Sequence, residues 1–104
     1  MGATSTTSAD GKMVTIKVTG RFDFNLHKEF RQAYAGHAAN GARYAVDLSG
    51  VDYLDSSALG MLLLLREHAG GERASITIGR CSPGIAKILQ IANFQRLFAL
   101  EPTA

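Results

Sequence analysis

The stretch that decides the fold reads Val46-Asp47-Leu48-Ser49-Gly50-Val51-Asp52-Tyr53-Leu54-Asp55-Ser56-Ser57-Ala58-Leu59-Gly60. An apolar segment that alternates like a strand gives way here to a strongly apolar segment of helical composition, and an aspartate and two serines stand at the junction. Serine and aspartate are favoured at helix starts because their side-chain oxygens accept hydrogen bonds from unpaired first-turn N–H groups. The junction therefore predicts a serine hydroxyl that is held on a rigid element and is accessible from solvent.

Alternation of apolar and polar residues predicts strands on both sides of this junction. The expected strands lie at residues 4–8, 14–18, 44–49, 74–78 and 97–100. Asp10-Gly11 is a tight-turn signal, so the first two strands should form an antiparallel hairpin. The first strand has almost no apolar side chains to bury, so its place in the sheet depends on pairing with the second strand.

Helical spacing of apolar residues separates the predicted strands. The first expected helix covers residues 26–37, with Asp23 or Asn25 as its cap and Asn40-Gly41 as its end. The second covers residues 56–68 and is ended by Gly70-Gly71. The third covers residues 83–92, is opened by Ser82-Pro83, and has an inner face of Ile85, Ile88, Leu89 and Ala92. Strands separated by helices imply crossover connections and parallel pairing. The fold class is therefore α/β, with a mixed sheet of four to five strands and crossover helices.

Length and composition limit the classes of protein to be considered. With 104 residues and 46% hydrophobic side chains, the chain is expected to form a single domain over residues 1–104, with its core at about 13–98. The apolar run 58–65 is too short to span a membrane, and the polar segment 1–10 lacks the hydrophobic region of a secretory signal. We therefore expect a cytoplasmic protein without direct membrane insertion.

The charged and sulfur-containing residues argue against several kinds of site. Lysines and arginines are scattered singly between Lys12 and Arg96, without the dense basic stripe that nucleic-acid binding requires. Cys81 is the only cysteine, which excludes a disulfide framework and indicates a packed or bystander thiol. The segment 79–84 lacks the lysine and spacing of a phosphate-binding loop. No cofactor, metal or nucleic acid is predicted.

The most specific part of the sequence, Asp55-Ser56-Ser57-Ala58-Leu59-Gly60, resembles the STAS domain of anti-sigma factor antagonists. Gly20-Arg21-Phe22-Asp23 resembles the glycine-x-apolar-aspartate motif that precedes the first helix in this family, and residues 82–98 resemble its C-terminal helix and following segment. The resemblance covers residues 13–98 and implies a STAS-like fold.

The resemblance implies a function in partner switching. It makes Ser56 the phosphoacceptor, with an anti-sigma factor or serine kinase as partner and a metal-dependent serine phosphatase that reverses the modification. From the residues alone, Ser56 is equally a plain N-cap of the helix. Ser57 is expected to be a first-turn helix residue or a secondary hydroxyl contact rather than the acceptor.

Asp23, Asp55 and Met61 are expected to support this site. Asp55 and Asp23 act either as orienters of the hydroxyl and the docking kinase or as helix caps, and both roles can hold at once. Asp47 and Asp52 should make the surroundings of Ser56 acidic. Met61 belongs to an apolar helix in which Leu59, Leu62 and Leu63 supply one face, so Met61, Leu64 and Leu65 are expected to form a partly exposed docking patch, with ordinary burial as the alternative.

Two other functions compete with partner switching. The first is a non-catalytic STAS adaptor subunit of a membrane transporter complex, which would share the fold but not the switch. The second is a small serine hydrolase that uses Ser56 or Ser57. Neither serine lies in a Gly-x-Ser-x-Gly elbow, and no spacing ties His27, His37 or His68 to a serine or a metal, so the chain is not expected to be an enzyme.

Overall fold

The computed structural model describes residues 2–36 and 43–101. Its strands and helices follow one another as β1 (Gly2–Thr7), β2 (Met13–Phe22), α1 (His27–Ala35), β3 (Arg43–Leu54), α2 (Ser56–His68), β4 (Ser75–Gly79), α3 (Pro83–Ile91) and β5 (Ala99–Leu100). Short 3-10 turns occupy Phe24–Leu26, Gly71–Arg73 and Phe94–Arg96.

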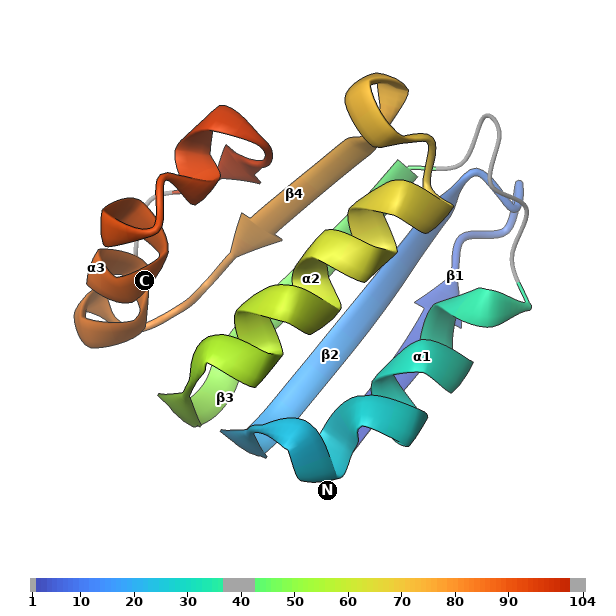
Figure 1. Cartoon of the computed structure of the whole chain (residues 1–104). Coiled ribbons are helices and arrows are strands. Elements are labelled where there is room, and N and C mark those ends of the chain that lie inside the picture. The colour runs from blue at the N-terminus through green and yellow to red at the C-terminus, as the bar shows by residue number, and fades with distance from the viewer. Residues whose placement is uncertain (1, 37–42, 102–104) are drawn as a thin grey trace.

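The five strands form one mixed sheet in the order β1-β2-β3-β4-β5 (Figure 1). β1 and β2 pair antiparallel from Gly2 opposite Thr19 to Thr7 opposite Val14, and every later pair is parallel. The α/β class, the mixed sheet and the N-terminal hairpin are thereby confirmed. Although β1 buries few side chains, it gains a full ladder of backbone hydrogen bonds, and the Glu29 carboxylate of α1 accepts a further one from the Ala3 N–H.

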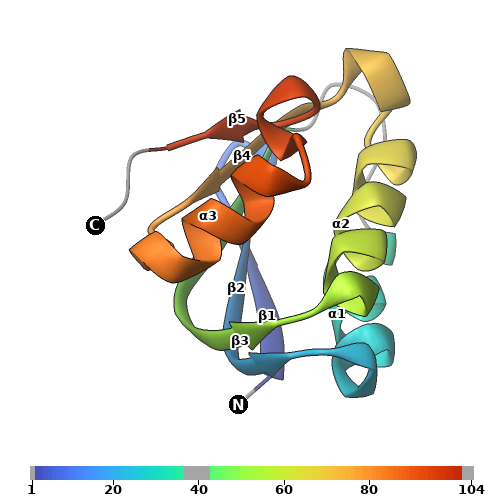
Figure 2. The ribbon, with the colours of Figure 1, turned by 60° about the vertical axis from the view of Figure 1, so that its left-hand side comes forward.

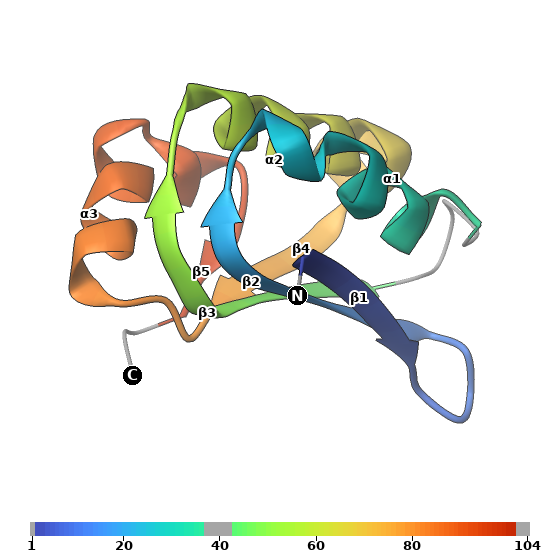
Figure 3. The same ribbon diagram turned by 90° about the horizontal axis from the view of Figure 1, so that it is seen from below.

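Helices α1 and α2 lie side by side over the same face of the sheet (Figure 3), and α3 lies toward the β4–β5 side (Figure 2). The alternation predicted for β2 is present, because Val14, Ile16 and Val18 are buried while the intervening residues are partly or fully exposed. The largest fully buried side chains are Tyr44, Phe22, Phe30, Ile16, Leu48, Leu62, Leu65, Ile78 and Leu89. One core therefore joins the sheet to all three helices.

β3 extends to Leu54, five residues beyond the predicted end at Ser49. Its pairing with β2 shifts register between Lys17 and Thr19 and again between Gly20 and Arg21, which interrupts the two-residue period. Ser49 and Gly50 are both exposed, yet Val51 and Leu54 are buried. Gly50 also lies tightly against β2, since a Cβ at this position would come within 2.8 Å of the Thr19 methyl group.

The helix boundaries agree with the predictions in part. α2 begins and ends as expected, and the Ser82 hydroxyl caps α3 by accepting a hydrogen bond from the Ile85 N–H at 3.4 Å. Ala92 was wrongly predicted to face inward, because it lies just after the end of α3 and is exposed. The predicted end of the first helix at Asn40-Gly41, and His37 with it, lie outside the described residues.

Cys81 is a packed thiol between β4 and α3, with 3% of its surface exposed. Burial raises the pKa of this thiol, because the low-polarity surroundings disfavour the thiolate. The packed alternative for Cys81 is therefore confirmed.

Candidate functional site

The sheet brings two aspartates to one edge. Phe22 of β2 pairs with Leu54 of β3 in parallel, so both strands end at the same level and the next residues are Asp23 and Asp55 (Figure 1). Each aspartate has an extended backbone and begins a helical segment, Asp23 the 3-10 turn before α1 and Asp55 the helix α2. Carboxyl ends of parallel strands are a common position for functional loops in α/β sheets.

Asp55 is the N-cap of α2. Its Oδ1 accepts hydrogen bonds from the Ser57 N–H at 3.0 Å, from the Ala58 N–H at 3.2 Å and from the Ser57 hydroxyl at 2.6 Å. The hydrogen bond from the Ser57 hydroxyl is the largest cause that lowers the pKa of Asp55, and the two backbone N–H groups and the charge of Arg21 act in the same direction. The carboxylate is therefore ionised and fixed at the helix start.

Ser56 is the first residue of α2 and is exposed. The N-cap reading of Ser56 is wrong, because the Asp55 side chain takes that position. Among the described residues, none forms a side-chain hydrogen bond with the Ser56 hydroxyl. Ser57 instead makes the secondary hydroxyl contact that was predicted for it. The serine pair thus contains one hydroxyl bound to the cap, that of Ser57, and one on an exposed residue, Ser56.

Asp23 has the capping role that was one of its two predicted alternatives, since its Oδ1 accepts a hydrogen bond from the Asn25 N–H at 3.0 Å. Its Oδ2 lies 3.5 Å from Nε of Arg21. The guanidinium carbon of Arg21 is also 3.9 Å from the centre of the Tyr53 ring, a cation–π distance. Sequence reasoning missed Arg21 and Tyr53, whose pairing depends on the β2–β3 register.

The surroundings of Ser56 are therefore less acidic than expected, because Arg21 lies among the carboxylates. Asp47 is also too distant to contribute: it pairs with Lys17 in mid-strand, eight residues before Asp55, which is on the order of 20 Å along a strand. Burial acts to raise the pKa of Asp47, but hydrogen bonds from Ser49 and the charges of Lys17 and Arg80 outweigh it and leave this pKa lowered. Asp52 lies on the last part of β3 and is exposed.

The predicted docking patch at Met61 is wrong. Met61 is 3% exposed and packs into the core together with Ala58, Leu62 and Leu65. Those four residues recur at the spacing of one helical face, which turns Leu63 outward and leaves Leu64 as the one exposed member of the predicted patch. Leu64 is 53% exposed and Leu63 is 38% exposed, so the ordinary-burial alternative holds for Met61.

The remaining candidate groups for a metal or hydrolytic site are the Ser57 hydroxyl and the histidines. The Ser57 hydroxyl donates to a carboxylate, whereas His27 and His68 line a groove between α1 and α2. Within residues 2–36 and 43–101, no group of three histidine, cysteine, aspartate or glutamate side chains is placed to hold a metal ion. In the same residues, every helix is too short or too polar to cross a bilayer.

Comparisons with known proteins place the sequence in a family. The family model described as "Mlab, STAS domain" matches residues 5–101. A STAS-domain containing protein of Pseudomonas aeruginosa (strain UCBPP-PA14) is 56% identical over 101 residues, which cover 97% of this chain and all of the relative.

Solved structures with a similar fold include two from antagonists of anti-sigma factors. The unphosphorylated form of the anti-sigma factor antagonist SpoIIAA superposes with a TM-score of 0.73 at 15% identity, over 99% of this chain and 90% of that chain. A candidate anti-sigma factor antagonist of Thermotoga maritima gives a TM-score of 0.79 at 14% identity, over 97% and 86% of the two chains.

A sulfate transporter family protein of Wolinella succinogenes is also similar, with a TM-score of 0.70 at 10% identity, over 90% of this chain and 80% of that chain. These three structures have low sequence identity to this chain and show its fold alone. The family is shown by the sequence, through the match over residues 5–101. With its paired aspartate caps and exposed helix-start serine, the chain belongs to the STAS domain family.

Proposed function

We propose that this chain is a partner-switching regulator whose binding to a protein partner is gated by phosphorylation of Ser56. The observation that carries the proposal is the division between the two serines: Asp55 binds the Ser57 hydroxyl, whereas the Ser56 hydroxyl is exposed at the first residue of α2. A kinase needs an accessible nucleophilic oxygen on a well-positioned backbone, and Ser56 supplies it.

Phosphorylation at this position changes the surface more than the fold. A phosphate adds about −1.5 to −2 charges at neutral pH, and the N-terminus of a helix tolerates negative charge. The Asp55 carboxylate already accepts hydrogen bonds from the Ser57 and Ala58 N–H groups, so the phosphate would project from the helix start toward solvent. A partner that covers Ser56 would then meet both its charge and its bulk.

The partner that we propose is an anti-sigma factor or a serine kinase, and a metal-dependent serine phosphatase would restore the unmodified state. Support comes from the similarity in fold to SpoIIAA and to the Thermotoga maritima protein. In this proposal the chain is a substrate and a ligand in the cytoplasm, with no catalytic role of its own. The kinase supplies ATP and its metal ion.

Intact-mass measurement tests the proposal directly. The chain is isolated from its own cells and, in parallel, incubated with the cognate kinase and ATP. We expect one added phosphate on the unaltered chain and on Ser57→Ala, and none on Ser56→Ala. Ser57→Ala is the matched control because it removes the neighbouring hydroxyl of the same helical turn. Phosphate retained in Ser56→Ala, or absent from every form, would contradict the proposal.

A second candidate function is that of a non-catalytic adaptor subunit in a membrane transporter complex. The similarity in fold to a sulfate transporter family protein favours it. Such an adaptor would co-purify with a transporter ATPase and would bind it equally well as Ser56→Ala and as Ser56→Asp. A difference between these two variants would favour the switch.

A further inference from the structure

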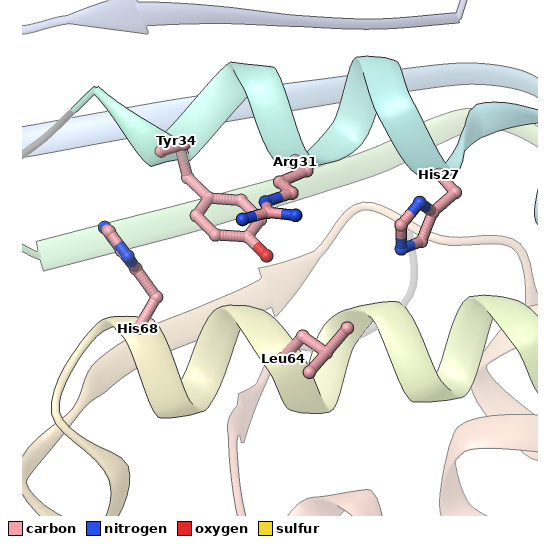
Figure 4. Close-up of a pocket in the computed structure, with 6 residues that line it drawn as sticks. His27, Arg31, Tyr34, Leu64 and His68 are labelled. Carbon is pink, nitrogen blue, oxygen red and sulfur yellow. The ribbon is translucent and has the colours of Figure 1, made fainter.

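A groove between α1 and α2 is the structural feature that the Ser56 switch leaves unexplained. We define the α1–α2 groove by the residues that line it: His27, Arg31, Tyr34 and Ala35 of α1, and Leu64 and His68 of α2. It has a volume of about 450 Å³ and is open to solvent (Figure 4). This volume is within the range of pockets that bind small groups.

The α1–α2 groove is rich in hydrogen-bond donors that suit an anion. Arg31 carries a permanent positive charge, and His27 and His68 each contribute an imidazole at the rim (Figure 4). None of its lining residues is acidic, and Glu29 of α1 is turned away to bind the Ala3 N–H of β1. The charge of Arg31 acts on Tyr34 in the groove. Burial raises the pKa of Tyr34, and the positive charge of Arg31 acts in the opposite direction.

The same groove offers an apolar surface beside these donors. Leu64 is half exposed on one wall, and the Tyr34 ring lies opposite it, with its centre 5.0 Å from the His68 ring. Tyr44 of β3 stands behind His68, with ring centres 6.5 Å apart. A guanidinium beside leucine and aromatic side chains suits a carboxylate whose neighbouring groups are apolar.

One end of the α1–α2 groove, at His27, lies near the edge of the sheet that carries Ser56. His27 is the first residue of α1, and its ring stacks on Phe24 at 5.5 Å between ring centres. Phe24 follows the Asp23 cap and is 69% exposed. On α2, Leu64 lies eight residues after Ser56, about 12 Å along the helix axis. A protein that covers Ser56 can therefore extend a segment into the groove.

We propose that the α1–α2 groove is a subsite for an acidic side chain, glutamate or aspartate with an apolar neighbour, of the protein partner that docks over Ser56. Arg31 is the principal contact of the carboxylate, and the half-exposed Leu64 receives the apolar neighbour. The identity of the partner in this inference rests on the proposed function. The chemistry of the groove does not depend on it.

A titration followed by NMR tests this chemistry without the partner. The probe is the tripeptide acetyl-Leu-Glu-Leu-amide, with acetyl-Leu-Gln-Leu-amide as its uncharged counterpart. We expect saturable shifts that are confined to the lining residues of the groove, and weaker binding of the glutamine peptide. Arg31→Gln should weaken binding of the glutamate peptide by about tenfold, the usual effect of losing one charged hydrogen bond.

Lys28→Gln is the matched control, because it removes one positive charge from the exposed side of the same helix outside the groove. It should leave the affinity within about twofold, since an exposed charge beyond a contact is largely screened. Equal losses in Arg31→Gln and Lys28→Gln would show attraction by net charge and overturn the inference. Equal binding of the two peptides would also overturn it.

Inorganic phosphate forms the second arm of the experiment. Tighter binding of phosphate than of the glutamate peptide at the same residues would identify a site for free oxyanions and would overturn the assignment to a protein carboxylate. Because neither arm involves the kinase, loss of the groove proposal leaves the Ser56 proposal standing. Absence of phosphate on Ser56 likewise leaves the peptide result intact.

Discussion

At the scale of single residues, Asp55 organises the site. One carboxylate oxygen accepts hydrogen bonds from the Ser57 hydroxyl and from two backbone N–H groups, and this arrangement both starts α2 and leaves Ser56 exposed. Arg21 adds a positive charge between the two aspartates of the edge while it stacks on Tyr53. Because Asp55 occupies the cap position, Ser56 is left exposed at the first residue of α2.

Asp55→Ala should destabilise the protein in a pH-dependent manner. Because folding lowers the pKa of Asp55 below its ordinary value of 3.8, its ionised form stabilises the fold above that value, and this stabilisation is lost as the pH falls through the lower, folded pKa. The difference in urea midpoint between the unaltered chain and Asp55→Ala should be constant from pH 7 to 5 and should shrink below about pH 4. A difference that grows toward acid pH would contradict this account.

The sequence predicted the position of the serine pair but not the division between its two hydroxyls. Asp55 and Ser56 are both good N-caps by residue type, so composition does not decide which of them occupies the cap. The outcome depends on where β3 ends, and a register shift near Gly50 hides that end from the alternation pattern. Arg21 was missed for the related reason that its partners come from neighbouring strands and loops.

At the scale of elements, α2 shows how an apolar helix is oriented by packing. From Ala58 to Leu65 nearly every side chain is apolar, so no polar residues mark the outer face in the sequence. Contact with α1 and the sheet selects Ala58, Met61, Leu62 and Leu65 for the core. The boundaries of the helix were predictable from its cap and its glycines, whereas its rotation was not.

Paired alanine substitutions check this rotation. Met61→Ala should lower the free energy of unfolding by roughly 2–5 kcal/mol, because it leaves a cavity in the core. Leu64→Ala should change it by less than about 0.5 kcal/mol, because that side chain is half exposed. Urea unfolding followed by circular dichroism measures both, and similar losses in the two variants would show that α2 is turned differently.

At the scale of the whole molecule, the parallel β2–β3 pair makes the site. The pair ends both strands at one edge, and the crossover helix between them starts there too, so Asp23, Asp55 and the beginning of both helices converge. The order of elements along the chain and the fold class were predictable, because alternation, glycine turns and helical spacing agreed along the chain. The α1–α2 groove was not, since it is formed by side chains of two helices whose relative rotation the sequence does not specify.

Ser56→Asp tests whether the modification leaves this architecture intact. An added negative charge at the first residue of a helix should leave stability unchanged or raise it by roughly 0.3–1 kcal/mol. Backbone amide shifts should be confined to the end of β3, the first turn of α2 and Arg21, while affinity for the partner falls. Ser56→Asn is the neutral control of similar size. Widespread shifts in Ser56→Asp alone would mean that the charge acts through the fold.

The binding of the Ser57 hydroxyl by its own helix cap has a consequence for selectivity. An enzyme that approaches this turn meets two chemically identical groups, but reaction at Ser57 requires its hydroxyl to break the 2.6 Å hydrogen bond that it donates to Asp55. If Ser56 is the acceptor, as proposed, this hydrogen bond gives an enzyme of broad sequence tolerance a reason to select Ser56 over its neighbour.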